Sequence, residues 1–283
     1  MEGARLEPNT GRLAEVAGRL PKPIARRLRR GRNLLNEVRL SAEDARLRIA
    51  TPASVRRLPP LPDTALDVLI ARNEHGLYCV PAAARGVVPR TIRRGKVWER
   101  DTLELLGAIA GDVVHAGAFF GDFLPALARS REGKVWTFEP NLENFRCATV
   151  TVYLNGLENV TLVHAGLSDR PGEAFVTTGA TGWNLSGGVA RLVFDDSFSR
   201  SREAVSVTTI DATVPEDRHV GAIHLDVEGH EQQALLGALR TIERCRPVIL
   251  VETLPSPEWL AQNLPGYRRS GQVDRNIVFR AQD

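Results

Sequence analysis

One stretch of the chain, residues 111–140, constrains the fold more than any other: GDVVHAGAFFGDFLPALARSREGKVWTFEP. Residues 113–115 form a short run that contains two β-branched valines, which predicts a strand. Gly117 and Gly121 then flank a sharp turn, and the apolar residues of 123–129 have the spacing of one helix face. A strand, a glycine turn and a helix in this order are typical of an open α/β sheet.

The second half of the stretch places an acidic residue where such sheets bind nucleoside ligands. A second strand is predicted over 135–138, and Glu139 follows its carboxyl end. In these sheets the charged end of a ligand faces the glycine turn and the start of the helix, while a carboxylate accepts hydrogen bonds from the ribose hydroxyls. The stretch therefore predicts a nucleoside-cofactor site that includes Glu139.

The glycine turn indicates which cofactor is favoured. It lacks the third glycine of the dinucleotide pattern GxGxxG, and Phe119 stands where the middle glycine would be. A pyrophosphate needs bare backbone at that point, whereas S-adenosyl-L-methionine (SAM) carries no pyrophosphate. We therefore expect SAM rather than NAD or FAD.

Strands and helices alternate from Gly111 to the end of the chain, which predicts a mostly parallel sheet with helices on both faces. The last two predicted strands are joined by a turn, and such a terminal antiparallel pair is the arrangement of SAM-dependent methyltransferases. The expected fold class is α/β: a Rossmann-like, doubly wound, mostly parallel seven-stranded sheet. The further predicted strands are 160–163, 205–210, 222–226, 248–252, 266–268 and 276–279; the further helices are 141–154 and 231–240, with a hairpin over 165–177.

Three regions are predicted along the chain. Residues 1–60 form a helical, basic N-terminal extension that ends at a proline-rich linker. Residues 61–110 hold a small hairpin, with strands at 76–81 and 86–88, and an amphipathic lead-in helix at 98–109. Residues 111–283 form the SAM-dependent methyltransferase domain. The basic extension has two interpretations, a solvated helix face or a surface for an anionic partner such as nucleic acid, and we favour the solvated face.

Composition limits the class of protein further. The 283 residues are 43% hydrophobic, which is enough for one large α/β domain with an appendage. The three cysteines are far apart and form no CxxC pair, so we expect reduced thiols and neither a disulfide framework nor a zinc site. The first residues lack the apolar stretch of a secretory signal, and no apolar run approaches the ~18 residues that span a membrane. We expect a bacterial, cytoplasmic protein.

Six motifs in order resemble the FkbM-type family of SAM-dependent methyltransferases, over roughly residues 75–280. The resemblance implies the class I methyltransferase fold, SAM as cofactor and methyl transfer as the activity. It rests on the order and spacing of the motifs rather than on any single one. The first motif joins Gly111-Asp112 to Gly117-Ala118 and Gly121, and the other five are Phe138-Glu139-Pro140, NGLENV at 155–160, Leu167-Ser168-Asp169, DVEGHE at 226–231 and Val251-Glu252.

Two positions depart from the family pattern. The family usually has an acidic residue where this chain has His115, and Asn where it has Phe119; that acid generally helps to hold the amino end of SAM. His115 is either a neutral substitution at a strand end or a site histidine. The predicted cofactor-binding residues are His115, Gly117, Ala118, Gly121, Glu139, Asn141, Asp169 and Asp226.

Two of these assignments have a structural alternative. Asn141 begins the predicted helix 141–154, so its side chain either caps that helix or touches the ribose, and capping is the stronger interpretation. Asp169 falls where many such enzymes contact the adenine amino group, yet Ser-Asp-x-x-Gly is also an ordinary turn.

The predicted catalytic residues follow the strand 222–226. Asp226 and Glu228 fall at its carboxyl end, beside the cofactor crevice, and His230 comes next. As a general base, Asp226 or His230 would take the proton of the acceptor. Alternatively, Asp226, Glu228 and a histidine would bind a divalent ion, or Glu228 would cap the next helix. We assign Asp226, Glu228 and His230 as catalytic and assign no metal site.

The expected activity is methylation of a hydroxyl on a small molecule, such as a secondary metabolite, or on a sugar or glycan. Three alternatives stay open: N-methylation or another SAM-dependent reaction; a module that uses the basic N-terminal helices to bind nucleotides or nucleic acid; and a non-catalytic scaffold. The expected partner is the acceptor itself, with no membrane span and no nucleic acid, and a homodimer is allowed.

Overall fold

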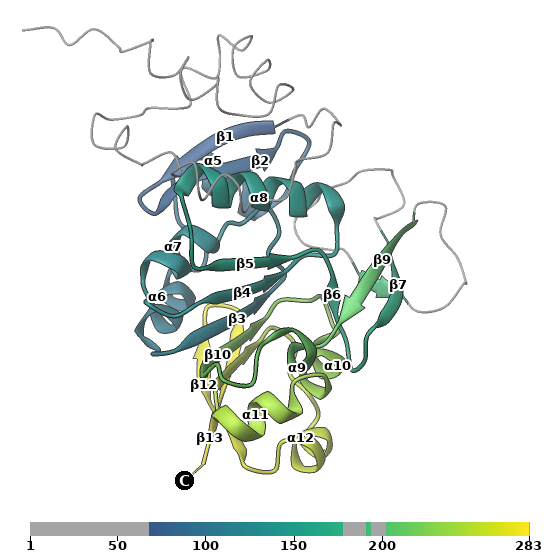
Figure 1. Ribbon diagram of the computed structural model, residues 1–283. Helices are drawn as coiled ribbons and strands as arrows, with labels where there is room; N and C mark the ends of the chain where they lie inside the picture. The colour runs from purple at the N-terminus through teal and green to yellow at the C-terminus, as the bar shows by residue number, and fades with distance from the viewer. Residues whose placement is uncertain (1–67, 178–190, 194–201, 283) are drawn as a thin grey trace, which may run out of the picture.

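A computed structural model describes residues 68–177, 191–193 and 202–282 (Figure 1). The predicted helical extension over residues 1–60, with its proline-rich linker, lies outside the described residues. The division of the chain into three regions stays a prediction.

The centre of the molecule is a seven-stranded sheet with the order β12-β13-β11-β10-β3-β4-β5. The pairs from β11 through β10, β3 and β4 to β5 are parallel, whereas β13 is antiparallel to both β11 and β12. The predicted seven-stranded sheet with a C-terminal antiparallel pair is therefore confirmed. Its strands are β3 (Asp112–Ala116), β4 (Val135–Phe138), β5 (Val160–Val163), β10 (Val220–Leu225), β11 (Val248–Val251), β12 (Tyr267–Val273) and β13 (Asn276–Ala281).

Helices cover both faces of this sheet (Figure 1). On one face lie α6 (Arg100–Ala108), α7 (Leu124–Arg129) and α8 (Leu142–Asn155). On the other lie α9 (Ile210–Thr213), α10 (Glu231–Leu236), α11 (Leu239–Cys245) and α12 (Pro257–Asn263). Because neighbouring residues of a strand face opposite sides, Val113 packs in the first core and Val114 in the second.

A separate hairpin, which precedes the central sheet in the sequence, packs against α8. Its strands are β1 (Val68–Asn73) and β2 (Gly76–Pro81), joined in antiparallel register. The predicted pairing of 76–81 with 86–88 is therefore wrong, because Val87 and Val88 begin helix α5 (Val87–Arg93). Pro89 in the first helical turn suits that start, since its missing N–H has no helical partner there.

Two further expectations differ from the structure. The segment 165–177 is not a hairpin: β6 (Gly166–Leu167) and β7 (Gly172–Thr177) both pair with β9 (Arg202–Thr208), and β8 (Arg191–Val193) completes this small sheet. The predicted helix 231–240 is two helices, α10 and α11, separated at Gly237. A Cβ at Gly237 would lie 2.1 Å from the carbonyl oxygen of Ser168, so the chain approaches too closely there for any side chain.

Candidate active site

A pocket opens at the carboxyl ends of β3, β4, β10 and β11. This is the edge where open α/β sheets bind ligands. Five of the predicted site residues line it: His115, Gly117, Glu139, Asp226 and Glu228. Residues ahead of the sheet, including Val87, Val88 and Trp98, form another part of its wall.

The glycine turn after β3 is required by close backbone packing. Gly117 has φ 88°, and a Cβ there would lie 2.1 Å from the carbonyl oxygen of Asp226. The amides of Gly117 and Ala118 both donate to the carbonyl of Phe138, at 3.1 and 3.0 Å. These two amides therefore join the turn to the end of β4, and Gly117 lies in the pocket wall.

Glu139 ties the turn to the start of α8. Its Oε2 accepts from the amide of Phe119 at 2.8 Å and its Oε1 from the amide of Asn141 at 2.9 Å. The residue is 5% exposed, and burial raises the pKa of Glu139 to about 7 although the two amides oppose the shift. The carboxylate is thus held rigidly in the pocket wall with lone pairs left for ribose hydroxyls.

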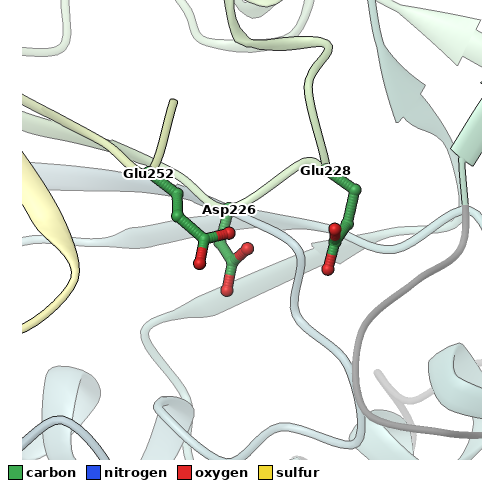
Figure 2. Close-up of side chains that lie close together, drawn as sticks. All are labelled: Asp226, Glu228 and Glu252. Carbon is green, nitrogen blue, oxygen red and sulfur yellow. The ribbon is translucent and has the colours of Figure 1, made fainter. Parts of the chain in front are cut away.

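Three carboxylates meet on the β10 and β11 side of the pocket (Figure 2). Asp226 follows β10, Glu228 lies two residues later in a left-handed turn with φ 53°, and Glu252 follows β11. Each offers an oxygen that lies within 4.8 Å of the others. Such a set can take up a proton from a bound hydroxyl, or hold a divalent cation that orients it. Glu252, rather than a histidine, completes the set.

The electrostatics of this set make the Asp226 carboxylate easier to protonate than a solvated one. Asp226 is exposed at the pocket surface, but desolvation by the surrounding protein, and then the charges of Glu252 and Glu228, raise its pKa above the usual range. One positive charge opposes them, because Arg275 forms an ion pair with Glu252 at 2.5 Å. A raised pKa makes the Asp226 carboxylate a stronger base than a solvated aspartate.

Five predicted site residues lie elsewhere or serve the framework, because the pocket wall does not include Ala118, Gly121, Asn141, Asp169 or His230. Asn141 caps α8, since its Oδ1 accepts from the amide of Asn144 at 3.0 Å. His230 begins α10, and its Nε2 lies 3.2 Å from Ser168 Oγ. Asp169 accepts from that same hydroxyl at 3.1 Å. Glu228 is not the cap of α10, because His230 holds that position.

Two charged pocket residues were missed by the sequence reasoning, Asp122 and Arg275. Asp122 follows the glycine turn, and Arg275 lies in the turn between β12 and β13. Neither carries a motif, so only the fold shows that they face the cofactor crevice. Trp98 and Glu99, just ahead of α6, also line the pocket. Glu99 makes no side-chain cap hydrogen bond to α6.

The sheet order, with its terminal antiparallel pair, and the carboxylate after β4 define the class I SAM-dependent methyltransferase fold. A family model, the methyltransferase FkbM domain, matches residues 115–269. The chain therefore belongs to the FkbM methyltransferase family. This confirms the predicted family, the SAM-dependent methyltransferase class and SAM as the cofactor.

Solved structures of similar proteins include the methyltransferase FkbM from Methylobacillus flagellatus KT, with 19% identity and a TM-score of 0.43; the match covers 60% of this chain and 43% of that one. This chain thus spans less than half of that protein. A methyltransferase from Geobacter sulfurreducens has 14% identity, coverage of 67% and 83%, and a TM-score of 0.39. A Streptococcus mutans protein described as a methyltransferase, solved with S-adenosylhomocysteine (SAH), has 10% identity, coverage of 64% and 96%, and a TM-score of 0.39.

A comparison with curated protein sequences gave no significant match. Within the described part of the chain, every helix is too short or too polar to cross a lipid bilayer.

Proposed function

We propose that this protein transfers the methyl group of SAM to a hydroxyl oxygen of a small molecule or a sugar. The observation that carries the proposal is the pocket itself: it joins a buried carboxylate suited to a ribose, Glu139, to a second group of carboxylates suited to an acceptor hydroxyl. SAM supplies an electrophilic methyl carbon on its sulfonium. The protein must therefore orient the acceptor and receive its proton.

The cofactor half of the pocket lies over β3 and β4. Glu139 would accept hydrogen bonds from the ribose hydroxyls, because its carboxylate is rigidly held at the end of β4. Gly117 would form part of the wall beside the ligand, because the lack of a side chain lets the turn pack against the carbonyl of Asp226. Three predicted residues would support the site without contacting SAM, by shaping the turn and the start of α8: Ala118, Gly121 and Asn141.

The acceptor half lies toward β10 and β11. Asp226 would receive the hydroxyl proton as the oxygen bonds to the methyl carbon, while the carbon–sulfur bond breaks and SAH leaves. Glu228 and Glu252 would accept hydrogen bonds from other hydroxyls of the acceptor. The indole of Trp98, on the same pocket wall, offers a flat apolar face of the kind that packs on a sugar ring.

Binding of SAH, measured by calorimetry, tests the cofactor half. Glu139→Gln, which keeps the shape but weakens the acceptors, should reduce affinity by about tenfold or more, because a hydrogen bond to a charged group is worth ~1.5–3 kcal/mol. Glu132→Gln changes an exposed carboxylate outside the pocket and should bind as the wild type does. Equal affinity of the wild type and Glu139→Gln, with unchanged melting temperatures, would refute the role of Glu139.

The pH dependence of the same binding gives an independent check. The ionised form of Glu139 accepts from the hydroxyls, and its pKa is about 7 without ligand. SAH affinity should therefore rise between pH 6 and pH 8 in the wild type. In Glu139→Gln that part of the dependence should be lost.

Methyl transfer is tested with SAM that carries an isotopically labelled methyl group. Incubation with panels of glycosides and hydroxylated small molecules should yield an ether product with the label on oxygen, and Asp226→Asn should abolish it without abolishing SAH binding. Label on nitrogen would establish N-methylation instead. Activity lost with EDTA and restored by Mg²⁺ would assign Asp226, Glu228 and Glu252 to a cation.

A further inference from the structure

A row of polar side chains, buried except for the half-buried Glu99, runs along the pocket from the residue before α6 to β3. Glu99 Oε2 accepts from Asn276 Nδ2 at 2.7 Å, and Asn276 Oδ1 lies 3.0 Å from His224 Nε2. His224 Nδ1 then lies 3.0 Å from His115 Nδ1. The two histidines occupy paired positions of the adjacent strands β10 and β3, and their rings are parallel to within 5°.

The orientation of the Asn276 amide is determined by its neighbours. Its Nδ2 donates to the Glu99 carboxylate and also lies 3.2 Å from Thr102 Oγ1. The Thr102 hydroxyl proton is already committed to Asp274 Oδ2 at 2.9 Å, so this hydroxyl can only accept from Asn276. Two acceptors therefore face Nδ2, and the carbonyl oxygen of the amide must face His224.

The protonation of both histidines follows from that orientation. His224 Nε2 faces a carbonyl oxygen, so it carries the proton, and burial lowers the pKa of His224 to about 4 and keeps the ring neutral. Its Nδ1 is then an unprotonated acceptor, and His115 Nδ1 must donate to it. Burial also holds the pKa of His115 well below its usual range. His115 is therefore neutral, with its free lone pair on Nε2.

That lone pair has no partner within the described part of the chain. His115 is 2% exposed, and its Nε2 is a buried atom with no hydrogen bond. His115 nevertheless forms part of the pocket wall. An unsatisfied buried acceptor is unfavourable, so its place beside a ligand pocket points to a donor on the ligand.

We propose that His115 positions the cofactor by accepting a hydrogen bond, through Nε2, from the ammonium group at the methionine end of SAM, and that Glu99, Asn276 and His224 are positioning residues that set its tautomer. The proposal rests on the proposed function, because it takes SAM as the ligand. It assigns a task to three residues that no motif marks, one just before α6, one on β13 and one on β10.

The position of His115 selects the ammonium among the donors of SAM. β3 lies between β4, whose Glu139 suits the ribose, and β10, whose Asp226 faces the acceptor. The sulfur of SAM carries the ribose, the methyl group and the methionine end, so with the ribose at Glu139 and the methyl group near Asp226 the methionine end would lie close to the end of β3. The ammonium is the hydrogen-bond donor of that end.

A neutral histidine also suits the charge of this pocket. Glu99, Asp122, Asp226, Glu228 and Glu252 already line it. A carboxylate at position 115 would add another buried negative charge to that group, which raises the cost of keeping each one ionised. A histidine whose tautomer is fixed supplies the acceptor without the charge.

The binding test compares SAH with its analogue that lacks the α-amino group. The wild type should prefer SAH by about tenfold to a hundredfold, the range for a hydrogen bond with one charged partner. His115→Phe, which keeps a flat ring against Phe123, should lose this preference and still bind the analogue as the wild type does. His219→Phe replaces an exposed histidine outside the pocket and should keep the full preference.

The tautomer test needs no ligand and no change at position 115. In ¹⁵N spectra of histidine-labelled wild type, His115 should show a protonated Nδ1 and an unprotonated Nε2, and His224 the reverse. Asn276→Leu should mix the tautomers of both rings and reduce the preference for SAH, although Asn276 does not line the pocket. A purely structural asparagine would change the melting temperature and leave the preference intact.

The outcomes separate this proposal from the function on which it rests. If the wild type binds neither SAH nor the analogue, the proposed cofactor site is refuted. If it binds both equally, or if His115→Phe keeps the preference, the role of His115 is refuted and the cofactor site stands. A protonated Nε2 on His115 in the wild type would refute the proposed tautomer, whatever the result of the binding measurements.

Discussion

At the scale of single residues, this pocket concentrates ionisable groups that burial holds in their uncharged forms. Burial raises the pKa of Glu139 and of Asp122 to about 7, and it lowers the pKa of His224 to about 4. A cofactor that brings a positive charge and several donors can compensate these carboxylates once it is bound. In the ligand-free protein these buried carboxylates have no such partner, and their desolvation lowers the stability of the fold.

The destabilisation caused by one such buried carboxylate, that of Asp122, can be measured. Asp122 is 8% exposed, its pKa is raised first by burial and then by the charge of Glu99, and in the unfolded chain it titrates near 3.8. A raised folded-state pKa stabilises the protein fully below about pH 4, and this contribution is lost as the pH rises through 7. Asp122→Asn should therefore increase the free energy of unfolding of the ligand-free protein at pH 8 by about 4 kcal/mol, with a higher melting temperature, and by much less at pH 5.

The matched control for this prediction is Asp101→Asn, which changes an exposed aspartate in the first turn of α6. Melting curves at pH 5, 6, 7 and 8 should show its stability following that of the wild type. If the melting temperatures of Asp122→Asn and the wild type change with pH in the same way across this range, the Asp122 carboxylate ionises in the folded protein without destabilising it.

Site residues that directly follow a strand can be identified from the sequence, whereas site residues in turns without a motif cannot. Glu139 and Asp226 were found because each directly follows a buried β-branched strand, so the sheet's topology alone brings them to one edge. Asp122 and Arg275 lie in turns without a motif, and their approach to the pocket depends on three-dimensional folding. His230 was misleading for a related reason: it is close to Glu228 in sequence, yet Ser168 holds it outside the pocket wall.

At the scale of elements, one side chain joins the amino ends of the central strands. Asp112, at the start of β3, accepts from Trp136 Nε1 on β4 at 2.9 Å and from the amide of Lys134 at 2.8 Å. Arg218, just before β10, donates to both of its oxygens, at 2.7 and 2.5 Å. Burial alone would raise the pKa of Asp112, but the hydrogen bonds from Arg218 and Trp136 bring it below its usual value.

Removing the arginine should therefore destabilise the sheet strongly. The Asp112 side chain is 3% exposed, and Arg218→Met would leave its charge without the cation. We expect a loss of about 3 kcal/mol in the free energy of unfolding, measured in urea at pH 7. Arg100→Met breaks the exposed pair with Glu74 and should leave the unfolding midpoint nearly unchanged. An equally small effect for both variants would show that the buried pair does not hold the strands.

The elements themselves were predicted well where periodicity and burial agree. The strand over Val135–Phe138 and the strand over Val160–Val163 match in both bounds, because β-branched and aromatic runs between turns leave little choice. The break of the predicted helix 231–240 at Gly237 depends on the carbonyl of Ser168, which is distant in sequence. Helix α5 was missed because its valines favour strands until Pro89 and the neighbouring hairpin are considered.

At the scale of the whole molecule, the hairpin β1–β2 and the pocket are coupled through α8. Asn155, 6% exposed, donates to the carbonyl of Leu77 at 2.6 Å and accepts from the amide of Leu77 at 3.0 Å. Thr151 similarly accepts from the amide of Cys79 at 3.0 Å and donates to the carbonyl of Phe120 at 2.8 Å. Two side chains of α8 thus bond to the free edge of β2, and one of them also reaches the glycine turn.

Loss of this contact should loosen the hairpin and weaken the pocket together. Asn155→Ala would leave the buried amide and carbonyl of Leu77 without these partners, which costs ~1–3 kcal/mol for each group. Hydrogen exchange should become faster across β1 and β2 while β10 and β11 keep their protection. Because Val87 and Trp98 connect this region to the pocket wall, SAH affinity should fall as well.

Asn159→Ala is the control, since it removes a nearby asparagine of the same kind whose side chain makes no hydrogen bond to the hairpin. Asn159 Nδ2 donates to the carbonyls of Ala128 at 2.9 Å and Gly133 at 3.0 Å, which hold the loop ahead of β4 rather than the hairpin. It should lower overall stability without selectively accelerating exchange in β1 and β2. If the two variants gave the same exchange pattern, the hairpin would unfold only with the whole domain, and its bond to α8 would have no separate influence on the pocket.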